Sequence, residues 1–261
     1  MTTLTGDARE HPYSSLLLEF KSAPPGKLYC LHGTKSVFRM SLAAAAHVLL
    51  NGLTVALVDG TNRFDAYYLA EFARRHAGAG PGGRRMTPED FLDRIHVSRA
   101  FTCYQMEAVI TERLPAFVRR TGTPVVIVFG LLDTFYDEQA PLFEVKAGVR
   151  RMVKALRTLR GDNVAVLLAS TDVRPASKER SGLFPALMTA MDEVYSITQT
   201  EGGERILKET TARYHRGADI ARGAGRYYGP DDPDIHHGDP AGNGELGKIP
   251  ERVAQRGPGR P

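Results

Sequence analysis

The chain has 261 residues, of which 42% are hydrophobic, and its formal net charge is +4. This length suits one sizeable domain with a tail. No run of about 18 apolar residues occurs, and residues 1–12 lack the apolar core of a signal peptide. The sequence therefore predicts no transmembrane helix, and we expect a cytoplasmic protein with no membrane partner. The mild positive charge is compatible with nucleic-acid binding but does not by itself predict it.

Predicted strands and helices alternate along most of the chain. A leader (1–25) is expected to hold one short amphipathic helix at about 14–21. The predicted strands that follow are 28–31, 55–58, 95–98, 125–129 and 164–169. The predicted helices are 38–50, 66–76, a short one at 87–94, 105–121, 144–159 and 183–191. Three short closing strands are expected at 194–198, 205–209 and 212–215. This alternation predicts an α/β fold with a doubly wound, mainly parallel sheet and helices on both faces.

Local signals support several of these boundaries. Asn51-Gly52 is typical of a helix end, and Thr87-Pro88 is typical of a helix start. The continuous apolar run at 125–129 indicates a strand buried on both faces. Cys30 and Cys103 fall in apolar stretches, so we expect two reduced core thiols. The segment 222–261 is rich in Gly and Pro and is predicted to be a disordered tail.

The turn after the first predicted strand resembles a phosphate-binding loop that has lost its key residues. A working loop of this kind reads G-x-x-x-x-G-K-[ST] between a strand and a helix. When the frame starts at Gly33, Phe38 takes the place of the second glycine and Arg39 the place of the lysine. Met40 then takes the Ser/Thr position, and Ser41 is a candidate stand-in for the missing hydroxyl.

Five segments in this order resemble the RecA/RadA recombinase superfamily, including its KaiC-like branch. They are 33–41 at the Walker A position, 55–65, 99–105, 125–138 at the Walker B position, and 166–171. The resemblance covers about residues 26–215 and implies a RecA-like P-loop NTPase-fold domain over 26–221. It also implies a role in DNA recombination or repair, with DNA or related RecA-like subunits as partners in a homo- or hetero-oligomer. ATP and Mg²⁺ are the cofactors it implies.

The departures from the family pattern bear on catalysis. Phe129 falls where the Walker B aspartate is expected, and Thr61 where the water-activating glutamate is expected. Loss of one positioned base costs roughly 10²- to 10⁴-fold in rate. We therefore expect a degenerate ATPase with little or no hydrolysis, and no catalytic residue is assigned.

Nucleotide binding is less clearly lost, because the N-terminus of the helix after Gly33 still offers N–H groups to an anion. The candidate nucleotide-binding residues are Gly33, Thr34, Lys35, Ser36, Arg39, Met40, Ser41 and Asp59. Asp133 and Asp137 are candidates to replace the missing Mg²⁺ ligands; the alternative is a solvated acidic loop. No other metal site is predicted.

Two basic segments are candidates for phosphate contact. Arg174, Lys178 and Arg180 lie in a loop that contacts DNA in RecA-like proteins, although an ordinary charged surface loop explains them as well. A second basic stretch lies on the predicted helix 144–159 and just beyond it, with most of its residues on one face. It is a solvated face, or it tracks a nucleic-acid backbone or an acidic neighbour. It consists of Arg150, Arg151, Lys154, Arg157 and Arg160.

Two alternatives to the recombinase-like reading stay open. The first is an active, non-standard ATPase that uses Arg39, Ser41 and either Asp133 or Asp137. The second is a protein-interaction module without nucleotide, in which the loop is collapsed and Phe38 is buried against the sheet.

Overall fold

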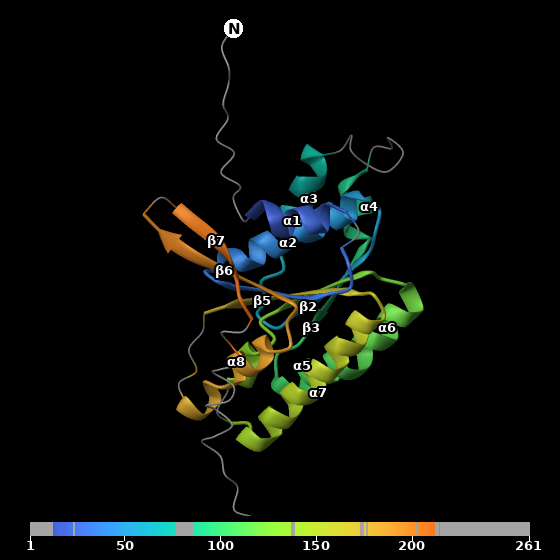
Figure 1. The fold of residues 1–261 in the computed structure, drawn as a ribbon. Coiled ribbons are helices and arrows are strands. Elements are labelled where there is room, and N and C mark those ends of the chain that lie inside the picture. Colours follow the sequence, from blue (N-terminus) through green and yellow to red (C-terminus); the bar gives the residue numbers. More distant parts are fainter. Residues whose placement is uncertain are drawn as a thin grey trace, which may run out of the picture. The chain divides into compact units, whose positions relative to one another are not determined.

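The structure is a computed structural model that describes residues 13–22, 24–76, 86–136, 139–172, 175, 177–201, 203–211 and 214. Its centre is a seven-stranded sheet in the order β3-β2-β4-β5-β1-β6-β7 (Figure 1). Neighbouring strands from β3 to β6 pair in parallel, and β7 pairs antiparallel with β6. The strands are β1 (Leu28–Gly33), β2 (Val55–Asp59), β3 (Ile95–Arg99), β4 (Val125–Phe129), β5 (Ala165–Thr171), β6 (Glu193–Thr200) and β7 (Gly203–Glu209).

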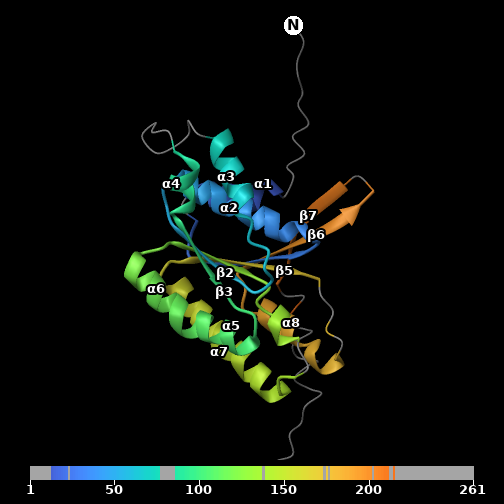
Figure 2. The same cartoon turned by 180° about the vertical axis from the view of Figure 1, so that it is seen from behind.

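Helices cover both faces of this sheet (Figures 1 and 2). One face carries α1 (Tyr13–Lys21), α2 (Ser36–Leu50), α3 (Ala66–Arg75) and α4 (Pro88–Leu92). The other carries α5 (Cys103–Ala108), α6 (Leu114–Thr121), α7 (Leu142–Gly161) and α8 (Leu183–Met188). The predicted fold class is confirmed: the protein is α/β with a mainly parallel, doubly wound sheet, an arrangement consistent with a RecA-like fold.

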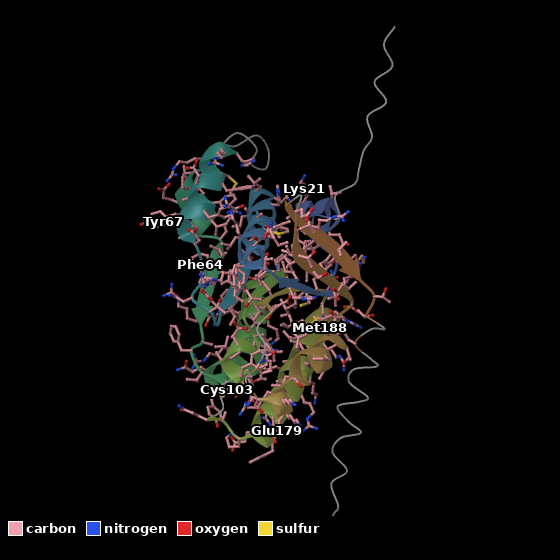
Figure 3. All side chains as sticks on the ribbon, turned by 90° about the vertical axis from the view of Figure 1, so that its left-hand side faces the viewer. Lys21, Phe64, Tyr67, Cys103, Glu179 and Met188 are labelled. Atoms are coloured by element: carbon pink, nitrogen blue, oxygen red, sulfur yellow. The ribbon has the colours of Figure 1, made fainter. Side chains whose placement is uncertain are left out.

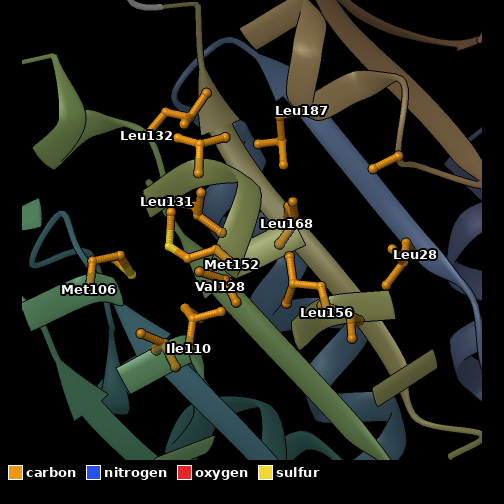
Figure 4. Close-up of a cluster of buried hydrophobic side chains, with 14 of the residues drawn as sticks. Leu28, Met106, Ile110, Val128, Leu131, Leu132, Met152, Leu156, Leu168 and Leu187 are labelled. Carbon is orange, nitrogen blue, oxygen red and sulfur yellow. The ribbon is translucent and has the colours of Figure 1, made fainter. Parts of the chain in front are cut away.

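Strands β1, β2, β4, β5 and β6 contribute side chains to two hydrophobic cores, because successive side chains point to opposite faces of a sheet. On β1, Leu28 and Cys30 enter the core beneath α5 to α8, whereas Tyr29 and Leu31 enter the core beneath α1 to α4. Figure 4 shows the first core, where Met152 and Leu156 of α7 pack among strand and α5 side chains. Neither Cys30 nor Cys103 forms a disulfide, and both are buried. The continuous apolar runs seen in the sequence are thus strands buried on both faces.

Several predicted boundaries are confirmed. Gly52 follows α2 with a φ of 75°, a conformation that favours glycine. Thr87 and Asp90 form a reciprocal capping box at the start of α4. Helix α2, however, begins at Ser36 rather than Phe38, which shortens the loop before it.

The single helix predicted over 105–121 is interrupted. A π-helical turn, Val109–Arg113, lies between α5 and α6, and Pro115 follows in the first turn of α6. Proline has no N–H to donate, and its ring crowds the carbonyl four residues earlier, so the regular hydrogen-bond ladder cannot pass through it.

Helix α1 packs as part of the folded unit. Leu16, Leu17 and Phe20 are buried in the same core as Tyr29, and the rings of Phe20 and Tyr29 meet edge-on at 5.3 Å. The predicted tail, 222–261, and most of the third closing strand lie outside the described residues. Within the part of the chain that is described, no helix is long and apolar enough to cross a membrane.

Candidate functional site

The carboxyl ends of β1 to β5 surround a cavity of about 790 Å³, which we call the rim pocket. This is the edge where ligands bind in open parallel sheets. Two cations, two exposed aromatic rings and a carboxyl group contribute to its lining. They are Lys35, Arg63, Phe101, Tyr104 and Asp133. The buried Phe38 lines it as well.

The loop expected to hold phosphate is too short to do so. Only Thr34 and Lys35 separate β1 from α2. Gly33 has a φ of 127°, and a Cβ at this position would lie 2.1 Å from the carbonyl oxygen of Ile197. The glycine is therefore required by the close approach of β6 and not by a phosphate group.

Phe38 and Phe129 replace the second glycine and the Walker B aspartate, and they pack on each other. Phe38 is only 6% exposed, and the two rings meet edge-on at 5.1 Å. Such pairs add to the stabilisation from burial alone. An apolar contact thus fills the space between the two positions from which a P-loop protein holds phosphate and metal.

The neighbouring candidates on α2, Arg39, Met40 and Ser41, do not line the rim pocket. The Ser41 hydroxyl is fully buried and donates to the Val37 carbonyl at 2.8 Å, so it does not stand in as a Mg²⁺ ligand. Met40 is buried. Arg39 is exposed, with its guanidinium 5.4 Å from the centre of the Tyr68 ring.

A carboxylate from β7 already occupies the start of α2. The hydroxyls of Thr34 and Ser36 donate to the same Glu204 oxygen, at 2.8 and 2.6 Å. A negative charge near a helix N-terminus is favourable. Glu204 therefore satisfies the site that was predicted to attract a phosphate.

Asp59, a second nucleotide-binding candidate, has a structural role instead. Its carboxylate is fully buried and accepts hydrogen bonds from Thr61 N at 3.0 Å, Thr61 Oγ1 at 3.2 Å, Arg63 N at 3.2 Å and Phe64 N at 2.9 Å. These bonds hold the turn after β2, and residues of this turn line the rim pocket. Asp59 itself does not line it.

Asp133 does line the pocket. Neither its Oδ1 atom nor the Thr134 hydroxyl has a hydrogen-bond partner among the described residues, and burial raises the pKa of Asp133. Asp137, its predicted partner in holding Mg²⁺, lies outside the described residues. No cluster of three metal-ligating side chains is found where the structure is described.

The residues of the predicted DNA-binding loop differ in exposure to solvent. Arg180 is only 4% exposed, and its guanidinium donates to the carbonyls of Phe135, at 2.7 Å, and Ala140. It ties the segment before α8 to the turn after β4, so the expectation that it contacts DNA is corrected. Lys178 is exposed, and Arg174 lies outside the described residues.

The aromatic part of the pocket was not predicted from the sequence. Phe101 is 67% exposed and Tyr104 is 56% exposed, an unusual state for rings at the edge of a core. The Tyr104 hydroxyl donates to Glu144 at 2.7 Å, and this bond raises the pKa of Tyr104. Tyr67, also exposed, does not line the pocket, and Figure 3 shows it well apart from Cys103. Two aromatic residues directly after a strand end were the signal available in the sequence.

A polar cluster around the buried His32, also missed, lies at the neighbouring end of β1. His32 Nδ1 lies 2.9 Å from Asp172 Oδ1, and His32 Nε2 lies 3.3 Å from the Tyr214 hydroxyl. The Tyr214 hydroxyl also donates to Glu209 of β7. The cluster links β1, β7 and the end of β5.

Comparison with models of known protein families finds no match to this chain, and comparison with curated protein sequences finds none either.

Proposed function

We propose that this chain is a RecA-like protein of DNA recombination or repair that binds single-stranded DNA at the rim pocket and does not hydrolyse ATP. The observation that carries the proposal is the pairing of exposed rings, Phe101 and Tyr104, with exposed cations, Lys35 and Arg63, around one cavity at the ligand-binding edge of the sheet. Sites for single strands combine stacking rings with cations in this way.

The two kinds of side chain have separate tasks. A base that stacks on Phe101 or Tyr104 gains about 1–3 kcal/mol, whatever its sequence. Lys35 and Arg63 attract the backbone phosphates and displace counterions from them. The free-energy gain from this counterion release falls as the salt concentration rises, so binding weakens with salt. Two such contacts give a slope of log affinity against log salt of about −1.4.

The packing described above supports the proposed lack of hydrolysis. A nucleotide bound in the usual P-loop manner requires Phe38 to leave Phe129 and requires Glu204 to release Thr34 and Ser36. The alternative of an active ATPase loses support, because Ser41 is buried and Arg39 lies over Tyr68.

Fluorescence anisotropy with a labelled oligothymidylate of about 20 nucleotides tests the proposal. Phe101→Ala together with Tyr104→Ala should weaken binding by at least about 10-fold, since each stacked base contributes about 1–3 kcal/mol. The double variant Lys35→Ala, Arg63→Ala should make the slope of log affinity against log salt shallower by about 1.4. Tyr67→Ala, at an exposed ring outside the pocket, is the matched control and should bind normally. Equal binding by all four proteins would exclude the rim pocket as the site.

A second candidate function, a protein-interaction module without nucleotide, is favoured by the burial of Phe38 against β4. The oligonucleotide titration distinguishes this alternative from DNA binding, because a pure interaction module does not bind the oligonucleotide. Thermal stability in the presence of Mg²⁺ and ATP should be unchanged under both.

A further inference from the structure

Helices α7 and α8 enclose a groove of about 480 Å³ that is separate from the rim pocket, since no residue lines both. We call it the α7–α8 groove. Its lining is partly apolar and its α8 side is built of small residues. One wall carries the cations Arg150, Lys154 and Arg157 of α7, with Val149 and Val153 beside them. The opposite side consists of Ala186, Thr189 and Ala190.

The wall cations differ from the others on the same helix. Arg151 forms an ion pair with Glu107, and Arg160 pairs with Asp192 at 2.7 Å. In the described part of the chain, no carboxylate forms an ion pair with Arg150, Lys154 or Arg157, and no acidic residue lines the groove. The chain thus neutralises the basic residues on the flanks of α7 and leaves uncompensated positive charge on the wall that faces α8.

The geometry of the wall matches a helix. Arg150, Lys154 and Arg157 have the spacing i, i+4, i+7, so they form one stripe of about 10 Å along α7. A second helix lying in the groove can present carboxylates at the same spacing. Ala186, Thr189 and Ala190 are small enough on the opposite side to let a helix backbone come close.

We propose that the α7–α8 groove docks an amphipathic helix of a partner protein, with carboxylates against the cationic wall and small apolar side chains against the apolar residues of the lining. These apolar residues favour this occupant over a nucleic-acid backbone, because a phosphate chain buries no apolar surface there. Helix-in-groove recognition combines these two kinds of contact. The inference stands on α7 and α8 alone and is independent of DNA binding at the rim pocket.

The probe for the test is a capped helical peptide of about 18 residues that carries Glu at i, i+4 and i+7 beside a Leu/Ala stripe. A scrambled peptide of the same composition, without the stripe, is its control. Anisotropy with the full chain should show saturable binding of the striped peptide and at least about 10-fold weaker binding of the scrambled one. The triple variant Arg150→Ala, Lys154→Ala, Arg157→Ala should lose about 10-fold, as expected for three exposed ion pairs.

Two further variants distinguish groove docking from general attraction to charge. Ala186→Glu places a carboxylate in the groove and should block the peptide, whereas the neutral Ala186→Gln should block it less. Arg119→Ala removes an exposed cation elsewhere and should have no effect. The proposal would be overturned if both peptides bind equally or if neither binds. It would also be overturned if an oligonucleotide displaces the peptide and the triple variant no longer binds that oligonucleotide.

Discussion

Replacement of Phe38 tests whether the phosphate-binding loop is filled by the protein itself. Phe38→Ala removes a ring that is 6% exposed and lies 5.1 Å from the Phe129 ring. Loss of a buried phenylalanine costs about 3–5 kcal/mol. About 0.5–1.5 kcal/mol of this belongs to the edge-on ring pair. Equilibrium unfolding in urea measures the sum directly.

A double-mutant cycle isolates the ring pair. Phe38→Ala, Phe129→Ala and the double variant should show a coupling free energy of about 0.5–1.5 kcal/mol. Phe143→Ala, at an exposed ring on α7, is the control and should change stability by no more than about 0.5 kcal/mol. Phe38→Leu serves if the alanine variant does not fold. A cost below about 1 kcal/mol for Phe38→Ala would show that the ring is in solvent and the loop open.

Three further predictions concern buried polar side chains, Asp59, Glu193 and Arg180. Asp59→Ala should cost roughly 3 kcal/mol in urea unfolding, because the N–H groups of Thr61, Arg63 and Phe64 lose their acceptor; a cost near zero would contradict the structural role. Burial acts to raise the pKa of Glu193, but hydrogen bonds from Lys27, Tyr195 and Lys208 outweigh it and lower the pKa to about 2. Because the folded pKa is depressed, this stabilisation is present above pH 4.5 and is lost as the pH falls toward 2. The free energy of unfolding should therefore fall by up to about 3 kcal/mol relative to Glu193→Gln over this range. Parallel curves of unfolding free energy against pH for both proteins would refute the prediction. Arg180→Ala should destabilise by roughly 2–3 kcal/mol, whereas exposed Lys178→Ala should be neutral in the same assay, and equal effects would contradict the burial of Arg180.

Local patterns in the sequence predicted most of the fold. The apolar run at Val125–Phe129 is typical of a strand buried on both faces, and Thr87 with Asp90 marks a helix start through contacts within one turn. The interruption before Pro115 was also local, and the helical periodicity around it concealed it.

The site depended on contacts that no local pattern encodes. Glu204 reaches Thr34 from a strand 170 residues further along the chain. Arg180 looks like a surface cation in sequence, yet its burial is decided by carbonyls at Phe135 and Ala140. Phe38 occupies a motif position whose meaning changes once Phe129 lies opposite it. In each case the role of the residue is decided by neighbours that lie far away in the sequence.

Binding of labelled oligothymidylate to the purified full chain, measured with and without Mg²⁺ and ATP, tests the central claim most directly. The account predicts saturable binding that weakens with salt, depends on Phe101 and Tyr104, and has the same Kd whether or not ATP is present. Binding that requires ATP, or no binding at low salt, would contradict it.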